Sequence, residues 1–222
     1  ITKKIIDLLD AFHLNKVQYV HWKSNLKLDQ ALSGSEDLDI LVDPKDKKKI
    51  LKLFRELQII RGFSRKDSWQ PSVYHYFGFD FSTTKIFHVH LHFELPIGFD
   101  YNKNYILPIR DSIFKEKITL SGVYVPCPEH EYILLVLRLI IKNACTPFLL
   151  SSPIRQYRLI KGANIIPKNA LDEFNHLKLI INRKKLMSLI KSDFKYLNPI
   201  LFKSCEAGIK KNRSIISFLT LA

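Results

Sequence analysis

Cysteine, long apolar runs and low-complexity tracts are scarce or missing in this chain of 222 residues. The three cysteines, Cys127, Cys145 and Cys205, lie far apart and form no C-x-x-C pair. This argues against a disulfide framework or a cysteine zinc site and favours a reducing, cytoplasmic location. No apolar run approaches the roughly 20 residues that span a bilayer, so we expect no transmembrane segment. Seven glycines and ten prolines exclude a collagen-like chain.

Acidic residues are also scarce in the last third of the chain. Residues 1–140 carry 20 basic and 17 acidic side chains, whereas residues 141–222 carry 15 and 4. Most of the formal net charge of +14 therefore lies in the C-terminal part. Positive charge attracts the phosphates of nucleotides, nucleic acids and anionic lipids. The composition thus allows a basic nucleic-acid-binding protein, and equally a solvated basic surface without a dedicated partner.

Hydrophobic periodicity predicts a mixed α/β half. Apolar residues recur at helical spacing over residues 2–14 and 47–57, with a short helical stretch at 26–32. Segments rich in aromatic and β-branched residues, separated by turn residues, predict strands at 17–22, 38–42, 59–64, 72–79 and 85–95, the last two as a hairpin, and a short strand pair at 118–125.

From Pro128 onward the pattern is helical. A segment that is apolar nearly all round, residues 129–143, predicts a buried helix. A long connection over 144–167 follows, and then helices at 168–181, 183–197, 199–210 and 214–221. We therefore expect an α+β fold, with a mixed sheet and flanking helices in residues 1–127 and a helical, strongly basic region in residues 128–222. The first residue is Ile1, so we expect a longer protein with a fused or partner domain.

The most informative local pattern is a pair of carboxylates on one predicted strand. Asp37 and Asp39 are two residues apart, so their side chains project from the same side, about 7 Å apart along the strand. Burying two unpaired carboxylates is costly, whereas oxygen ligands arranged in this way suit a divalent cation, in particular Mg²⁺. A solvated strand entrance is the alternative interpretation.

A second pattern lies on a later predicted strand. His88, His90, His92 and Glu94 alternate with apolar residues and therefore share one face. If His90, together with His92, faces the acidic pair, it can bind a metal ion or accept a proton. Imidazole binds transition metals better than it binds Mg²⁺. A site that includes these histidines is therefore also an option for Mn²⁺ or Zn²⁺. The alternative is a half-buried strand whose polar face meets solvent.

The segment from Val17 to Asp43 resembles the nucleotidyltransferase superfamily, which has a DNA polymerase β-like fold. That family is marked by an apolar residue followed by Gly-Gly or Gly-Ser, and then, after a short interval, by Asp, an apolar residue, and Asp or Glu. Here Trp22-Lys23-Ser24 precedes Asp37-Leu38-Asp39-Ile40 by 12 residues. The run from Gly122 to Glu131, leading into an apolar helix, resembles aminoglycoside-type and related minimal bacterial members.

This resemblance implies transfer of a nucleoside monophosphate from an NTP to an acceptor hydroxyl or phosphate. The acceptor is a small molecule, a glycan precursor, a protein or a nucleic acid. Asp37 and Asp39 would hold Mg²⁺, or Mn²⁺. From the pattern of the later strand, and not from the resemblance, we expect His90 and His92 as further metal ligands and His90 as the third catalytic residue. The implied nucleotide-binding residues are Lys23, Ser24, Asn25, Gly34, Ser35 and Lys142.

Two departures from the family pattern leave other functions open. Lys23 stands where the family has Gly, and the predicted strand at 85–95 has no Asp in its middle. Either a histidine or Glu94 replaces the third acid, or the site is incomplete. A catalytically degenerate nucleotidyltransferase fold that binds or regulates a partner is therefore an alternative to the enzyme. Ser24 is also a candidate helix N-cap.

Overall fold

A computed structural model describes residues 2–63, 72–97, 105–144 and 168–193. These residues belong to two compact units. The first comprises residues 1–96 and 108–127, and the second comprises residues 97–107 and 128–222. None of the described helices combines the length and apolar character that crossing a membrane requires. The helices predicted at 199–210 and 214–221, and nearly all of the connection at 144–167, lie outside the described residues.

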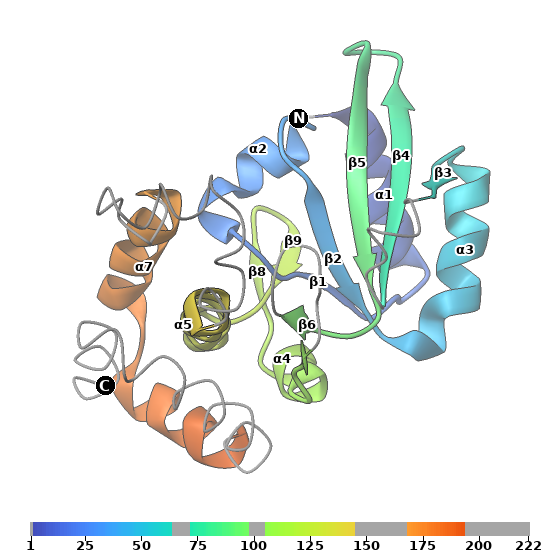
Figure 1. Cartoon of the computed structure of the whole chain (residues 1–222). Helices are drawn as coiled ribbons and strands as arrows, with labels where there is room; N and C mark the ends of the chain where they lie inside the picture. The colour runs from blue at the N-terminus through green and yellow to red at the C-terminus, as the bar shows by residue number, and fades with distance from the viewer. Residues whose placement is uncertain (1, 64–71, 98–104, 145–167, 194–222) are drawn as a thin grey trace, which may run out of the picture. The chain divides into compact units, whose positions relative to one another are not determined.

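The first unit is built on a mixed five-stranded sheet in the order β1-β2-β5-β4-β3 (Figure 1). Only β2 and β5 run parallel; the other neighbouring strands are antiparallel. The α+β class and the mixed sheet expected from the sequence are confirmed. The strands are β1 (Tyr19–His21), β2 (Leu38–Val42), β3 (Ile60–Gly62), β4 (Val73–Asp80) and β5 (Lys85–His92).

Two helices, α1 (Lys3–Leu14) and α3 (Lys47–Glu56), cover one face of this sheet. Their apolar stripes pack on alternate residues of the strands, for example Ile40 of β2 and Val89 of β5, both fully buried. Since strand side chains alternate between faces, Asp39 and the β5 histidines emerge on the opposite face. The core thus fixes which face carries the polar side chains.

Smaller elements complete the first unit. The segment predicted as a helix at 26–32 is a 3-10 turn, η1 (Asn25–Lys27), followed by α2 (Leu28–Leu32). The strand pair predicted around Ser121-Gly122 is a hairpin, because both turn residues have positive φ. No element was predicted for residues 96–117, where the structure has β6 (Pro96–Ile97), β7 (Tyr105–Ile106) and α4 (Arg110–Lys115). Of these, α4 belongs to the first unit and β7 to the second. The hairpin strands are β8 (Ile118–Leu120) and β9 (Val123–Val125), and η2 (Pro44–Asp46) precedes α3.

From Pro128 onward the described part of the second unit is helical, as its sequence pattern predicts. It contains α5 (Pro128–Ala144), α7 (Lys168–Ile180) and a helix over residues 183–193. Leu135 of α5 packs with Phe174 and Leu177 of α7. The buried carboxylate of Glu129 accepts a hydrogen bond from the backbone N–H of Asn182 at 2.7 Å. Apolar packing and a buried polar contact therefore both tie these helices together.

Asp46 anchors the start of α3, and its titration gives a pH-dependent test of the fold. Its carboxylate accepts hydrogen bonds from the Gln18 backbone N–H at 2.8 Å and from Lys49 Nζ at 2.9 Å. Burial acts to raise the pKa of Asp46, but these two donors outweigh it and hold the pKa below its ordinary value. The contribution to stability is therefore complete above the unfolded-state pKa, about 3.9, and is lost as the pH falls through the lower folded-state pKa.

We expect Asp46→Asn to lower the free energy of unfolding by about 1 kcal/mol at neutral pH. The difference from the native sequence should shrink as the pH falls below about 4, where Asp46 of the unfolded chain takes up a proton, and should be lost below the lower folded-state pKa. Urea unfolding at neutral pH and near pH 3 measures both values. An equal cost at both pH values would show that the charge of Asp46 does not matter.

Candidate active site

The acidic pair meets the histidine strand because β2 and β5 are parallel neighbours. In their register Asp39 lies beside His90, and Leu41 lies beside His92. Neighbouring residues in register share a face, so the Asp39 carboxylate and the imidazoles of β5 project together on the face opposite the helices. The structure therefore brings four predicted site residues together: Asp37, Asp39, His90 and His92.

Asp39 is the centre of this cluster. Its Oδ1 accepts from Lys23 Nζ at 2.6 Å and lies 3.0 Å from His92 Nε2 and 3.3 Å from His90 Nδ1. Burial alone would raise the pKa of Asp39, but the Lys23 ammonium and the two imidazoles hold it well below its ordinary value. Asp39 is therefore a partly buried carboxylate that is ionised at neutral pH.

Asp37 lies just before β2 and is more exposed, with 49% of its side chain accessible to solvent. Its Oδ1 is 2.9 Å from His88 Nδ1, and its Oδ2 is 3.7 Å from His90 Nδ1. The hydrogen bond from His88 is the main reason that the pKa of Asp37 is lowered. His90 Nδ1 thus lies between the two carboxylates.

His92 is neutral at physiological pH. Burial, and then the charge of Lys23, lower its pKa to about 3. Because its Nε2 faces the Asp39 carboxylate, Nε2 carries the proton and donates it. The buried Nδ1 then has a lone pair, and it has no hydrogen-bond partner among the residues that the structure describes. The ring packs edge-on against Trp22 at 5.2 Å.

His75 also belongs to this cluster, although it was not among the predicted site residues. In the β4–β5 hairpin His75 is paired with His90, and its Nδ1 is 3.1 Å from His88 Nε2. Burial, followed by the neighbouring imidazoles, lowers its pKa. The predicted turn after Asp80 could have indicated this position. When Asp80 pairs with Lys85, the hairpin register places residue 75 opposite residue 90.

The predicted nucleotide-binding residues before α2 have structural roles of their own. Lys23 lies against Asp39 and also over the Trp22 ring, 4.6 Å from its centroid. Ser24 has a left-handed backbone (φ 53°) and makes no side-chain capping bond, so the predicted N-cap interaction is wrong. Glycine adopts that conformation more readily than other residues. Asn25 Oδ1 is 2.7 Å from His21 Nδ1.

The other predicted site residues lie at different places. Gly34 has a positive φ, and a Cβ there would come within 3.2 Å of Phe87 Cβ. The Ser35 hydroxyl hydrogen-bonds to the Ser33 hydroxyl at 3.1 Å. Glu94, considered as a substitute third acid, forms an ion pair with Arg110 at 3.3 Å. The Lys142 side chain lies outside the described part of the chain.

The cluster offers one mixed donor set for a metal ion. Single ligand atoms of Asp39, His90 and His92 all lie within 4.8 Å of one another. Asp37, whose carboxylate also flanks His90 Nδ1, can add an oxygen ligand. Two carboxylates suit Mg²⁺ or Mn²⁺, whereas the imidazoles favour Mn²⁺ or Zn²⁺. By donor chemistry this site fits a divalent cation, with Mn²⁺ matching both ligand types.

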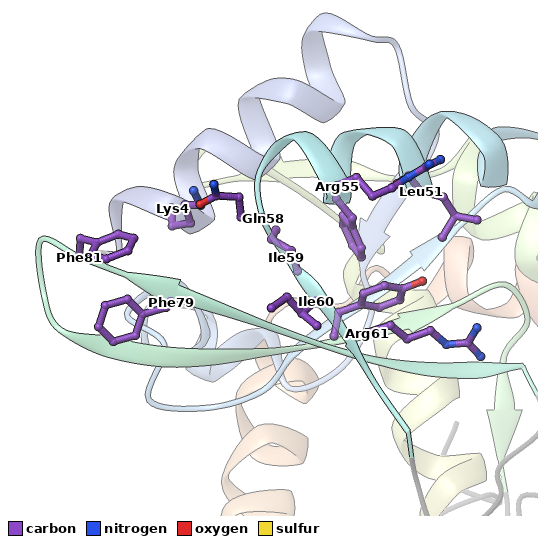
Figure 2. A pocket seen from close by; sticks show the side chains of 11 residues that line it. Lys4, Leu51, Arg55, Gln58, Ile59, Ile60, Arg61, Phe79 and Phe81 are labelled. Atoms are coloured by element: carbon purple, nitrogen blue, oxygen red, sulfur yellow. The ribbon is translucent and has the colours of Figure 1, made fainter.

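A separate open groove of about 830 Å³ lies at the β3 edge of the sheet, and Figure 2 shows the side chains that line it. Its walls come from α1, α3, β3, β4 and the adjoining loops, so the groove is distinct from the acidic pair on β2. Most of its side chains are apolar, including Leu51, Ile60, Phe79 and Phe81, and three are basic: Lys4, Arg55 and Arg61.

No protein-family model and no curated protein matches this chain. Among solved structures it is similar to the antibiotic-resistance factor ANT(2'')-Ia, an aminoglycoside nucleotidyltransferase. The sequence identity is 8% and the TM-score is 0.45, over 91% of this chain and 95% of that one.

Proposed function

We propose that this protein is a metal-dependent nucleotidyltransferase that moves a nucleoside monophosphate from an NTP to an acceptor hydroxyl or phosphate. One observation carries the proposal: the parallel pairing of β2 with β5 gathers Asp37, Asp39 and His90 beside Lys23 on a single face. Two carboxylates that can hold a metal ion, a cation and a potential base on one partly exposed face are groups that phosphoryl-type transfer can use.

Charge defines the role of each residue in this proposal. Mg²⁺ or Mn²⁺ held by Asp37 and Asp39 would neutralise charge on the triphosphate and on the leaving pyrophosphate. Lys23 adds a positive charge next to the same carboxylates, where it can contact phosphate oxygens. The backbone N–H groups around Ser24 lie next in the chain and are candidates to bind phosphate. Positioning and charge stabilisation then supply most of the catalysis.

His90 is the residue best placed to receive the acceptor's proton. Its Nδ1 lies 3.3 Å from an Asp39 oxygen and 3.7 Å from an Asp37 oxygen, so Nδ1 holds a proton. Nε2 is left with the lone pair and can accept the proton of an incoming hydroxyl. The carboxylates would stabilise the imidazolium that results, as the aspartate of a serine-protease triad does for its histidine.

The proposal is tested by calorimetry and thermal unfolding with ATP, CTP, GTP and UTP in turn, each with Mg²⁺, Mn²⁺ or EDTA. We expect at least one NTP to stabilise the native chain in a metal-dependent way. At about 100 times its Kd, bound nucleotide adds about 2.7 kcal/mol to the free energy of unfolding. The double variant Asp37→Ala/Asp39→Ala should lose this stabilisation while keeping a native circular-dichroism spectrum. Absence of stabilisation with every nucleotide and metal would reject the enzyme.

A catalytically degenerate binding module is the second candidate. It is favoured by the Lys23 ammonium, which already neutralises Asp39, and by a β5 strand that offers imidazoles in place of a third carboxylate. The same experiment separates the two functions, because NTP binding that EDTA does not weaken supports the module. A role of the basic region in nucleic-acid binding stays a prediction, since much of residues 141–222 lies outside the described part.

A further inference from the structure

A second group of imidazoles lies beside the acidic pair, and the proposed reaction does not use all of it. His75 comes from β4, and His88 and His90 come from β5. One ring nitrogen from each lies within 4.8 Å of the others, and all three side chains are half-buried. His75 has no part in the proposed transfer, although it lies directly opposite His90 in the hairpin register.

The spacing of the closest two nitrogens matches that of ligands on one metal ion. His75 Nδ1 and His88 Nε2 are 3.1 Å apart. In a tetrahedral zinc site, with Zn–N bonds of about 2.0–2.1 Å, neighbouring nitrogens lie roughly 3.3–3.4 Å apart. A small adjustment of two side chains on the open face of the sheet would therefore admit an ion.

The acidic pair orients two of these three imidazoles. Asp37 Oδ1 lies 2.9 Å from His88 Nδ1, and Asp39 Oδ1 lies 3.3 Å from His90 Nδ1. In both rings Nδ1 therefore carries the proton and Nε2 has the lone pair. Metal-binding histidines characteristically donate their other ring N–H to a carboxylate in this way, which fixes the tautomer and strengthens the ligand.

We propose that His75, His88 and His90 form a three-imidazole binding site for a transition-metal ion of the Zn²⁺ class. Three nitrogen ligands on a partly exposed face leave the fourth position open for water or a phosphate oxygen. The site goes beyond the proposed function and does not rest on it. An ion bound here occupies His90 Nε2, so metal binding and the use of His90 as a base exclude each other.

The probe is Co²⁺, which replaces Zn²⁺ and absorbs intensely in the visible range when it is four-coordinate. The protein carries no polyhistidine tag and is first treated with EDTA. We expect one equivalent of Co²⁺ to bind with a four-coordinate spectrum and to be displaced by Zn²⁺. His75→Gln should abolish that spectrum. Asp37→Asn should weaken Co²⁺ binding about 10- to 100-fold, the usual effect of removing a carboxylate behind a metal-bound histidine.

His176→Gln is the matched control, because His176 is exposed and lies on α7, outside the cluster. It should bind Co²⁺ as the native chain does. Circular dichroism verifies the fold of each variant. If His75→Gln does not fold, NMR of the Co²⁺-loaded native chain replaces it: three exchangeable imidazole N–H signals should be paramagnetically shifted.

A six-coordinate Co²⁺ spectrum, binding that survives His75→Gln, or binding that His176→Gln reduces equally would overturn the site. The result is also separable from that of the nucleotide experiment. His75→Gln should keep metal-dependent NTP binding, whereas Asp37→Ala/Asp39→Ala should lose it. Co²⁺ binding without any NTP binding would reject the proposed function alone, and NTP binding without four-coordinate Co²⁺ would reject the histidine site alone.

Discussion

Replacing Lys23 with methionine should lower the free energy of unfolding by about 3 kcal/mol when no divalent metal ion is present. Removing one partner of a buried ion pair typically costs about 3–5 kcal/mol, because the other charge stays buried. The pair of Lys23 and Asp39 is short, at 2.6 Å, and the two side chains are only 17% and 14% exposed. His90 and His92 still contact the carboxylate, which places our estimate at the lower end.

The same substitution should strengthen the binding of a divalent cation. Two unit charges 4 Å apart near a protein surface interact by about 4 kcal/mol, so the Lys23 ammonium opposes any cation at Asp39. Mn²⁺ at about 100 times its Kd should raise the free energy of unfolding of the variant by about 2.7 kcal/mol. At the same Mn²⁺ concentration the native chain should gain less.

Urea unfolding in EDTA and in Mn²⁺, followed by circular dichroism, measures both effects. Lys27→Met is the matched control. Lys27 pairs with Glu36 at 3.4 Å, but these side chains are 37% and 52% exposed, so the cost should stay below about 1 kcal/mol. Two results would contradict this prediction: Lys23→Met as stable as the native chain in EDTA, or no gain in its free energy of unfolding with Mn²⁺. Either would show that Lys23 does not compete with a divalent cation for the Asp39 carboxylate.

Gly78→Val should destabilise the first unit by about 3 kcal/mol, at the upper end of the usual cost of overpacking. A Cβ on Gly78 would come within 2.2 Å of Cζ and 2.6 Å of Cε1 of Phe87. Phe87 is only 1% exposed and belongs to the core beneath α1 and α3, so its ring has no room to move. A side chain in place of a strand glycine normally gains about 0.5–1 kcal/mol, and here the clash outweighs that gain.

Gly62→Val provides the comparison. A Cβ on Gly62 would also meet an aromatic ring, 2.5 Å from Phe77 Cε2, but Phe77 is 41% exposed and can turn toward solvent. We expect this variant to stay within about 1 kcal/mol of the native chain. Thermal or urea unfolding ranks the two. Equal losses of stability in Gly78→Val and Gly62→Val would show that the buried Phe87 ring does not limit the space at Gly78.

Local sequence patterns were sufficient to predict the elements that carry the acidic pair. The strand at 38–42 has the predicted bounds. A turn before the apolar run and Pro44 after it limit where this strand can begin and end. Segments that depend on distant contacts were not predicted. The helix α4 has six residues, of which only Ile113 is described as buried, too short to show a period of 3.6.

The site could be predicted one strand at a time but not across strands. The alternation of His88, His90 and His92 was visible, whereas their partners depend on which strand lies next to β5. That choice is made by the core: α1 and α3 bury Ile40 and Val89, and this aligns Asp39 with His90. The left-handed backbone at Ser24 and the contact between Lys23 and Asp39 also arise from tertiary packing, so no sequence pattern indicated them.

The carboxylate of Asp80 stabilises the turn between β4 and β5. Asp80 accepts hydrogen bonds from the backbone N–H and the hydroxyl of Ser82, from the Thr83 hydroxyl, and from the backbone N–H of Lys3 at the start of α1. It thereby fixes the hairpin register that places His75 opposite His90.

A shift of a strand by one residue moves every side chain to the opposite face. Gain or loss of a single residue in this turn would therefore carry the histidines of β5 into the apolar core and Val89 out to solvent. Homologues could exchange individual imidazoles without altering the hairpin, but they could not change the length of this turn. Insertions and deletions at residues 81–84 should therefore disrupt the histidine cluster, even though three of these four positions are polar and all are exposed.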